Sequence, residues 1–255
     1  MQDITEHVKL DEMRKEFVAD VSHELKTPIT SIMGYSDTLL QSSVPENMQK
    51  EFLGRISEEA NRMSELVSDL LTLSKYDTTK VGDKEEFDLA EVTKQAFDRL
   101  RLEADKKNQD AECLITSDVP HVYADKKGIE RVVLNIISNA IKYTPENGTI
   151  KIYVGSVYND AYIKVIDNGI GIPEEDLSKV FERFYRVDKS RTRGMGGTGL
   201  GLPIAKEILN QNDGKIDIKS EFGKGTEVVI RIPTKQALDK SFNKNTSEKN
   251  KREDE

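Results

Sequence analysis

Two long stretches near the start of the chain repeat apolar residues at the spacing of an α-helix. In the first stretch most of them recur every three or four residues and share one face; they are Val18, Val21, Leu25, Ile29, Ile32 and Leu39. In the second stretch they approach the heptad seam of a coiled coil; they are Phe52, Ile56, Ala60, Met63, Leu66, Leu70 and Leu73. A polar turn with a proline, residues 41–47, separates the two stretches. The pattern predicts a helical hairpin over residues 1–80.

Two helices bury little apolar surface by themselves. We therefore expect the hairpin to pair with a second copy of the chain, forming a four-helix bundle in a homodimer. The alternative is that the hairpin folds onto the rest of its own chain. The regular seam of the second helix favours the dimer.

From residue 87 to residue 233 helical and extended patterns alternate. The predicted helices are 89–106, 126–142 and 200–211, and the predicted strands are 113–116, 149–157, 161–167, 214–219 and 226–232. Several neighbouring strands are joined only by short turns. This favours an α+β sandwich with a mixed sheet and helices on one face over a doubly wound parallel sheet.

Composition divides the chain further. Residues 77–86 are polar and lack apolar periodicity, which is typical of a linker. Residues 236–255 are half charged and nearly devoid of apolar side chains, so we expect a disordered tail. The predicted segments are a hairpin over 1–80, a linker over 81–86, an α+β domain over 87–235 and a tail over 236–255.

The overall composition excludes several classes of protein. The 255 residues carry a net charge of −8, which argues against nucleic acid as the main partner. The single cysteine, Cys113, allows neither an intrachain disulfide nor a cysteine metal cluster and suits a reducing cytosol. No segment approaches the ~18 consecutive apolar residues of a membrane helix. We expect a soluble cytoplasmic core, and any membrane attachment would come from segments outside this sequence.

One histidine is set apart from the apolar stripe of the first helix. At roughly 100° per residue, His23 lies about 200° from Val21 and Leu25 and so projects from the opposite face. Glu24 follows it, and a carboxylate beside an imidazole can accept a ring N–H and make the other nitrogen a better nucleophile. Thr27 shares the face of His23, and Pro28 removes a helical N–H, which favours a bend. His23 is therefore a candidate nucleophile, with a solvated surface pair as the alternative.

Two segments of the second domain carry polar groups suited to a nucleotide. Asn135 and Asn139 lie four residues apart on one helix face, and carboxamide oxygens suit a hydrated Mg²⁺; a polar helix edge is the alternative. Asp167 ends a predicted strand and precedes Gly169 and Gly171. Its carboxylate can accept from the exocyclic amine of adenine, where guanine carries an oxygen. An Asn-Gly turn is the alternative interpretation of this segment.

A glycine-rich run, residues 196–202, leads into the last predicted helix. Glycines let the backbone approach anionic oxygens, and the helix N-terminus favours phosphate. No Gly-Lys-[Ser/Thr] ends the run, so it is not a Walker loop. Upstream, an aromatic pair precedes a basic stretch that includes Arg186 and Lys189. Residues 187–197 are polar and contain glycine, which predicts a mobile lid; a solvated basic loop is the alternative.

Taken together, these segments resemble the sensor histidine kinases of two-component systems. Residues 17–28 resemble the phosphoacceptor box of that family. The segments that begin at Asn135, Asp167, Phe181 and Gly196 resemble, in order and spacing, the N, G1, F and G2 boxes of its ATPase domain, and residues 222–226 resemble a G3 box. The resemblance covers residues 10–235 and implies a HisKA-type dimerisation hairpin followed by a Bergerat-type α/β sandwich with a mixed sheet.

The resemblance also implies roles for the candidate residues. His23 would be phosphorylated by ATP, Glu24 would be its general base, and Thr27 would serve a second activity, phosphatase toward the partner. Asn139, with Asn135, would hold Mg²⁺, and Asp167 would bind the adenine amine. The other implied nucleotide contacts are Lys142, Tyr143, Gly169, Gly171, Arg186, Lys189, Gly197, Thr198, Gly199, Leu200 and Gly201. The implied partners are a second copy of the chain and a response-regulator receiver domain, whose aspartate would take the phosphoryl group.

Three alternatives belong to other classes of protein. A clamp-type ATPase of the same superfold places a water-activating glutamate four residues before the Mg²⁺ asparagine, where this chain has Asn135. A Ser/Thr-directed anti-sigma kinase would lack the His23 hairpin. A dimeric adaptor with a degenerate nucleotide site would have lost a box, and none is missing.

One departure from the family stands at Asn212-Asp213-Gly214, where relatives usually carry His-Gly-Gly. Because asparagine and aspartate tolerate turn geometry, we expect no loss of activity.

Overall fold

The structure is a computed structural model that describes residues 2–41, 44–78, 82–116, 118–187 and 197–235. The predicted tail, residues 236–255, and the predicted nucleotide residue Lys189 lie outside these ranges. Two compact units make up the chain: residues 1–72 with 182–200, and residues 73–181 with 201–255. No helix in the described part of the chain is both long and apolar enough to cross a membrane.

The predicted helical hairpin is confirmed. It consists of α1 (Gln2–Leu39) and α2 (Glu46–Thr78), and α1 continues through Pro28. On the seam of α2, Leu66 and Leu73 are buried. Val18 and Ile29 of the predicted α1 stripe are 58% and 43% exposed, so one hairpin does not cover its own apolar stripe.

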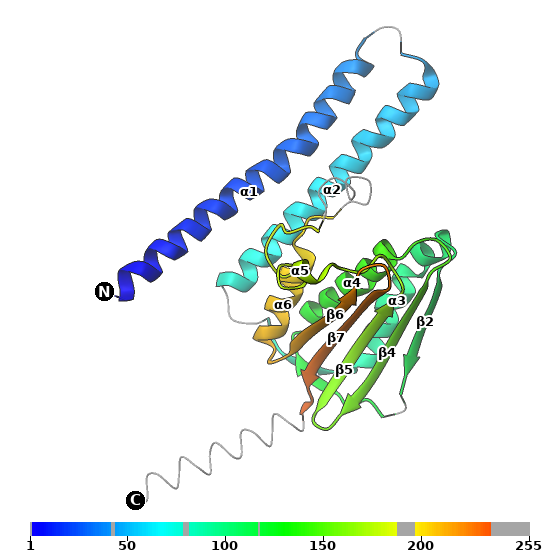
Figure 1. The fold of residues 1–255 in the computed structure, drawn as a ribbon. Coiled ribbons are helices and arrows are strands. Elements are labelled where there is room, and N and C mark those ends of the chain that lie inside the picture. Colours follow the sequence, from blue (N-terminus) through cyan, green and yellow to red (C-terminus); the bar gives the residue numbers. More distant parts are fainter. Residues whose placement is uncertain (1, 42–43, 79–81, 117, 188–196, 236–255) are drawn as a thin grey trace, which may run out of the picture. The chain divides into compact units, whose positions relative to one another are not determined.

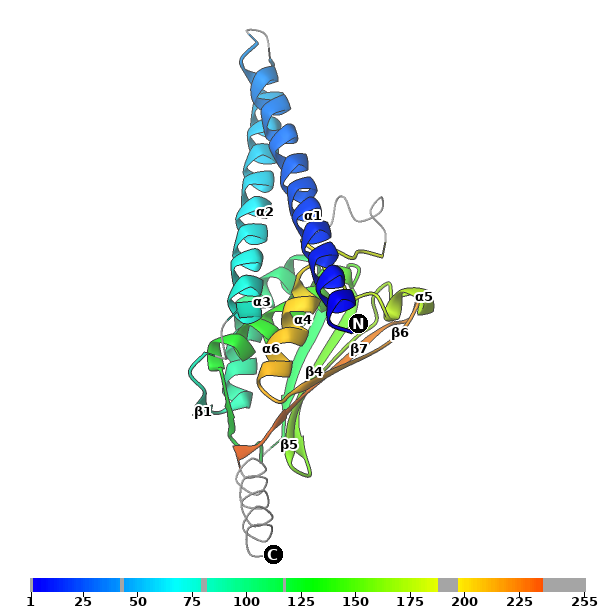
Figure 2. The same ribbon diagram turned by 90° about the vertical axis from the view of Figure 1, so that its left-hand side faces the viewer.

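The second unit contains a five-stranded mixed sheet with helices on one face, as predicted (Figures 1 and 2). The strand order is β2-β4-β5-β7-β6; β2 and β4 are parallel and the other neighbours are antiparallel. The strands are β2 (Asp110–Ile115), β4 (Thr149–Val157), β5 (Asp160–Asp167), β6 (Lys215–Glu221) and β7 (Gly225–Pro233). The helices are α3 (Leu89–Lys106), α4 (Lys126–Tyr143) and α6 (Gly201–Gln211), with a short α5 (Glu174–Leu177) between β5 and α6.

The core of this unit follows from the periodicity of its sequence. In β4, Ile150, Ile152 and Val154 alternate with less buried residues, so one face of the strand enters the core. Helix α4 buries an aliphatic stripe that includes Ile129 and Ile136, and it is capped at its N-terminus by Asp125. This packing fixes α4, which carries Asn135 and Asn139, against the sheet.

Three short elements were not predicted. They are α5 and the two strands β1 (Glu85–Phe87) and β3 (Val122–Ala124), which pair with each other. Elements of three or four residues are too short to show a hydrophobic period. Part of the predicted linker therefore lies in β1.

The last residues of α2, from Leu73, belong to the second unit, and Tyr76 makes a buried hydrogen bond there. The Tyr76 hydroxyl donates to Asp125 Oδ2 (2.7 Å), and Gln211 Nε2 donates to the Tyr76 carbonyl. The Asp125 N–H donates to Asn212 Oδ1 (2.8 Å), so the residue that departs from the family pattern is buried in this network. Burial, the hydrogen bond to Asp125 and the charge of that carboxylate together raise the pKa of Tyr76.

We expect Tyr76→Phe to lower the free energy of unfolding by about 1–3 kcal/mol at neutral pH, because it leaves a buried acceptor without its donor. Since the folded-state pKa is raised, the contribution of Tyr76 is complete below the ordinary tyrosine range and is lost as pH rises above about 10. The stability gap between wild type and variant should therefore narrow at alkaline pH. Urea unfolding of both proteins at pH 7.5 and pH 10.5 measures it, and a gap that widens would contradict the assignment.

Candidate functional site

His23 is presented to solvent on α1. His23 is exposed, as predicted from its position opposite the apolar stripe, whereas Pro28 is buried. The Thr27 hydroxyl donates to the His23 carbonyl oxygen (3.3 Å). The Glu24 carboxylate lies 3.7 Å from the Arg62 guanidinium of α2, an ion pair with about a quarter of each side chain exposed. Within the hairpin unit, an exposed histidine is therefore followed in sequence by a glutamate whose carboxylate is paired with the second helix.

The two asparagines of α4 are half-buried and lie one turn apart. The Asn135 side chain donates from Nδ2 to the carbonyl oxygen of Gly201 (3.2 Å), the first residue of α6. This bond engages the amide nitrogen and leaves the amide oxygen as an acceptor. In the part of the chain that the structure describes, no three His, Cys, Asp or Glu side chains gather into a metal site. The carboxamide oxygens of Asn135 and Asn139 are of the kind that suits a hydrated Mg²⁺, and their role as its ligands stays a prediction.

The end of α4 is joined to the loop after β5. The Tyr143 carbonyl oxygen accepts from the Ile170 N–H (3.2 Å). A Cβ atom added at Gly169 would lie 2.5 Å from that oxygen, so a side chain there would prevent the approach. The Lys142 ammonium lies 4.9 Å from the centre of the Tyr143 ring. The structure thus brings together four predicted nucleotide residues: Lys142, Tyr143, Asp167 and Gly169.

Asp167 is held by the backbone. Its Oδ1 accepts from the Gly169 N–H (2.8 Å) and from the Thr226 N–H (3.3 Å). Burial raises the pKa of Asp167, and these two hydrogen bonds partly oppose the rise. Both bonds use the same oxygen, so Oδ2 is the atom suited to accept from an outside amine.

Gly171 closes the same loop against the β6–β7 turn. Its φ of +66° lies in the left-handed region, and an added Cβ would collide with the Glu221 carbonyl oxygen. The Gly223 N–H donates to the Ile170 carbonyl oxygen (2.8 Å), joining the loop to that turn. The backbone of this loop can therefore approach the turn only because residue 171 has no side chain.

The glycine-rich run belongs to the other unit as far as Leu200. The Thr198 hydroxyl donates to Asp69 Oδ2 (2.6 Å) and accepts from the Leu200 N–H (3.2 Å). Gly199 has a φ of +71°, and a Cβ there would lie 2.9 Å from the Phe184 Cα atom. Arg186 and Gly197 are half-buried, and Leu200 is fully buried directly before Gly201 opens α6. The predicted nucleotide residues therefore fall in both compact units, and their assembly into one site stays a prediction.

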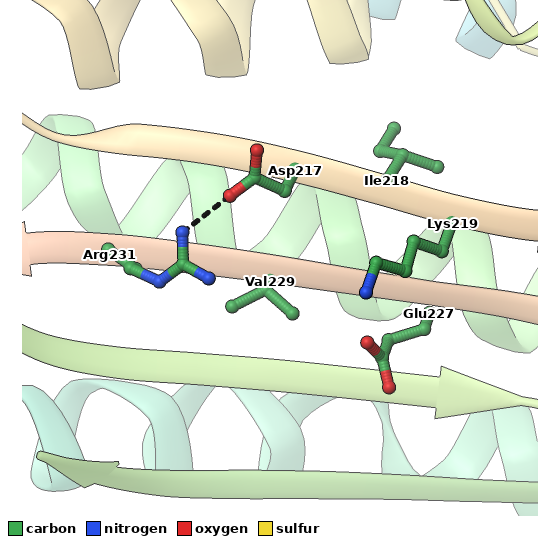
Figure 3. Close-up of a pocket in the computed structure, with 6 residues that line it drawn as sticks. All are labelled: Asp217, Ile218, Lys219, Glu227, Val229 and Arg231. Atoms are coloured by element: carbon green, nitrogen blue, oxygen red, sulfur yellow. Dashed lines mark hydrogen bonds and ion pairs between the residues drawn. The ribbon is translucent and has the colours of Figure 1, made fainter. Parts of the chain in front are cut away.

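A separate depression lies on the sheet and is not the predicted site. It has a volume of about 370 Å³ and lies over β6 and β7 (Figure 3). Its lining residues are Asp217, Ile218, Lys219, Glu227, Val229 and Arg231. Arg231 and Asp217 are paired at 2.6 Å, and Glu227 is paired with Lys164 at 3.4 Å. None of the predicted site residues lines this depression.

Two contacts of the candidate residues were missed by sequence reasoning. Thr226 was assigned only to a G3-like loop, yet its N–H binds the Asp167 carboxylate. Arg62 was assigned no role, yet it pairs with Glu24. Both contacts join residues distant in sequence, and no local spacing signals them.

The fold defines a class of protein, one that joins a histidine-bearing helical hairpin to an α/β domain with a mixed sheet. The comparisons give its family. Residues 13–79 match the family of the His Kinase A (phospho-acceptor) domain. Residues 124–236 match the histidine kinase-, DNA gyrase B- and HSP90-like ATPase family. The chain belongs to the sensor histidine kinases.

Individual relatives agree with this family. The chain is 42% identical over 238 residues to the sensor histidine kinase WalK of Bacillus subtilis, covering 92% of this chain and 39% of that protein. It is similar to the catalytic domain of the histidine kinase ThkA (32% identity, TM-score 0.53), covering 60% of this chain and 97% of that one. It is also similar to ThkA in complex with the response regulator protein TrrA (29% identity, TM-score 0.72), covering 86% of this chain and 61% of that one. The chain thus spans about two fifths of the length of its Bacillus relative.

Proposed function

We propose that this chain is the catalytic core of an autophosphorylating protein histidine kinase. ATP would phosphorylate His23, and the phosphoryl group would then pass to an aspartate of a response regulator. The observation that carries the proposal is the exposure of His23 beside Glu24, inside the region that matches a phosphoacceptor domain. The match of residues 124–236 to an ATPase family supports ATP as the phosphoryl donor.

The transfer itself is a substitution at phosphorus. An imidazole nitrogen of His23 forms a bond to the γ-phosphorus, the bond from that phosphorus to the bridging oxygen breaks, and ADP leaves. Glu24 accepts the ring proton. This chemistry depends mainly on positioning and on charge neutralisation. The main structural requirement on His23 is therefore an imidazole that is exposed to an incoming nucleotide.

The nucleotide would be held by both glycine-bearing segments. Asp167 Oδ2 accepts from the adenine amine, and Gly169, Gly171 and Tyr143 shape the base pocket. The phosphate contacts would come from Lys142, Arg186, Lys189, Gly197, Thr198, Gly199, Leu200 and Gly201. Asn139 and Asn135 would hold Mg²⁺, which neutralises charge on the phosphates when bound.

The partners follow from the family and from the surface of the hairpin. The exposed Val18 and Ile29 support a homodimer, because a second hairpin would cover them. The solved complex of ThkA with TrrA supports a response-regulator receiver domain as the second partner. We further propose that Thr27 takes part in a phosphatase activity toward that regulator. The cytoplasmic location of the chain stays a prediction from its sequence.

A clamp-type ATPase is the main alternative, and the structure bears on it. The residue four before Asn139 is Asn135, whose side-chain amide binds the Gly201 carbonyl oxygen. A carboxamide has no basic site for activating water. The γ-phosphate would therefore need an acceptor other than water.

We expect ATP labelled at the γ-phosphate to label the protein covalently when Mg²⁺ is present. A phosphohistidine bond is labile in acid and stable in alkali, so the label should be lost at pH 2 and kept at pH 12. Label that survives acid would indicate a hydroxyl acceptor. Release of free phosphate without any label would favour the clamp-type ATPase.

A further inference from the structure

At the end of α4, two side chains from another loop donate hydrogen bonds to backbone carbonyls. A helix leaves its final four carbonyl groups without intrahelical donors. In α4 these groups lie beside Lys142 and Tyr143, where the proposed base pocket begins. The two side chains are Lys107 and Gln109, from the loop between α3 and β2. Neither was singled out by the sequence or by the family resemblance.

Lys107 places its ammonium group at the centre of this helix end. Its Nζ donates to the carbonyl oxygens of Ile141 (2.8 Å), Lys142 (2.9 Å) and Thr144 (3.1 Å). An ammonium group has three N–H donors, so this set uses all of them. A cation at a helix C-terminus also interacts favourably with the helix dipole.

Gln109 reinforces the same turn from a buried position. It is 6% exposed, and its Nε2 donates to the carbonyl oxygens of Ile141 (3.0 Å), Thr144 (2.7 Å) and Pro145 (3.3 Å). Two of these carbonyls are shared with Lys107. Removing the lysine therefore leaves those two carbonyls with a donor, while Lys142 loses its bond to the ammonium.

The same turn binds the loop that carries Asp167. The Tyr143 carbonyl oxygen accepts from the Ile170 N–H, and Gly169 lies against it. Asn168 Oδ1 accepts from the Thr149 N–H (2.7 Å), which holds the loop to the start of β4. A displacement of the α4 terminus would therefore move Tyr143 and the Asp167 loop together.

We propose that Lys107 and Gln109 are positioning residues of the purine site. They hold the final turn of α4 through its carbonyls, and that turn sets Tyr143 and the Asp167 loop at the spacing that an adenine needs. The inference rests on the proposed binding of ATP. It adds that base recognition depends on Lys107 and Gln109, whose hydrogen bonds described above all go to backbone carbonyls of residues 141–145.

The test measures nucleotide affinity and base selectivity in the full chain. Isothermal titration gives the Kd for ATP and for GTP with wild type, Lys107→Met, Lys107→Arg and Gln109→Leu. We expect Lys107→Met to weaken ATP binding about tenfold, the size of one hydrogen bond to a charged group. GTP binding should change less, so the preference for ATP should narrow. Lys107→Arg should recover part of the affinity, because it keeps a cation with several donors.

The matched control is Lys106→Met, which removes an exposed lysine from the adjacent position. Urea unfolding without nucleotide separates positioning from stability, since a purely structural role would lower the midpoint and leave the selectivity of the folded protein unchanged. If Lys107→Met matches Lys106→Met in affinity and selectivity while wild type binds ATP, the inference is overturned and the proposed function stands. If wild type binds no ATP, both are overturned.

Discussion

Replacing His23 by glutamine should abolish covalent labelling by ATP and leave the affinity for ATP within about twofold of wild type. Glutamine keeps a polar side chain of similar size on an exposed helix position, so the hairpin should fold normally. It has no nucleophilic ring nitrogen to form the bond to phosphorus. The measurement pairs a labelling time course with a titration of ATP binding on the same preparation.

His121→Gln is the matched control for this experiment. His121 is also exposed, and its ring lies 3.4 Å from Glu86 in the α/β unit. We expect the His121 variant to be labelled at the wild-type rate. Normal labelling of the His23 variant would show that another group accepts the phosphoryl group, and loss of ATP binding would show that the substitution disturbed more than the acceptor.

Long periodic elements were predictable from the sequence, and the reason is physical. Helix α3 and strand β4 have the predicted bounds, and α4 differs by one residue, because each carries several repeats of its hydrophobic period. Strands β1 and β3 contain three residues each and show no period. The exposure of His23 was also predictable, since its angle from the apolar stripe depends only on helix geometry.

The contacts that shape the candidate site depend on topology instead. The parallel pairing of β2 with β4 places Asp110 opposite Thr149, and this register brings the loop of Lys107 beside the end of α4. The antiparallel pairing of β5 with β7 places Asp167 opposite Thr226. A sequence names the polar residues available for such contacts, but the strand order decides which of them meet.

The second large effect is expected at Asp167. Replacing it by asparagine should weaken ATP binding about a hundredfold, while the affinity for GTP should fall much less. Asparagine can keep Oδ1 as the acceptor for the Gly169 and Thr226 N–H groups. The other position becomes an NH₂ group, which would face the adenine amine donor to donor. Such a mismatch costs about 2–3 kcal/mol when the groups are shielded from water. Isothermal titration with both nucleotides measures it.

The same substitution should not destabilise the fold, which separates recognition from folding. Burial raises the pKa of Asp167, so between its ordinary value and the raised value the folded state holds more protons than the unfolded state, and stability falls as pH rises through that range. Asparagine carries no charge, so at pH 7.5 the variant should be at least as stable as wild type in urea. Asp160→Asn, at the opposite end of β5, is the control and should bind ATP normally. Unaltered ATP affinity in Asp167→Asn would show that the carboxylate takes no part in base recognition. Because the variant is expected to fold normally, a loss of affinity could not be attributed to unfolding.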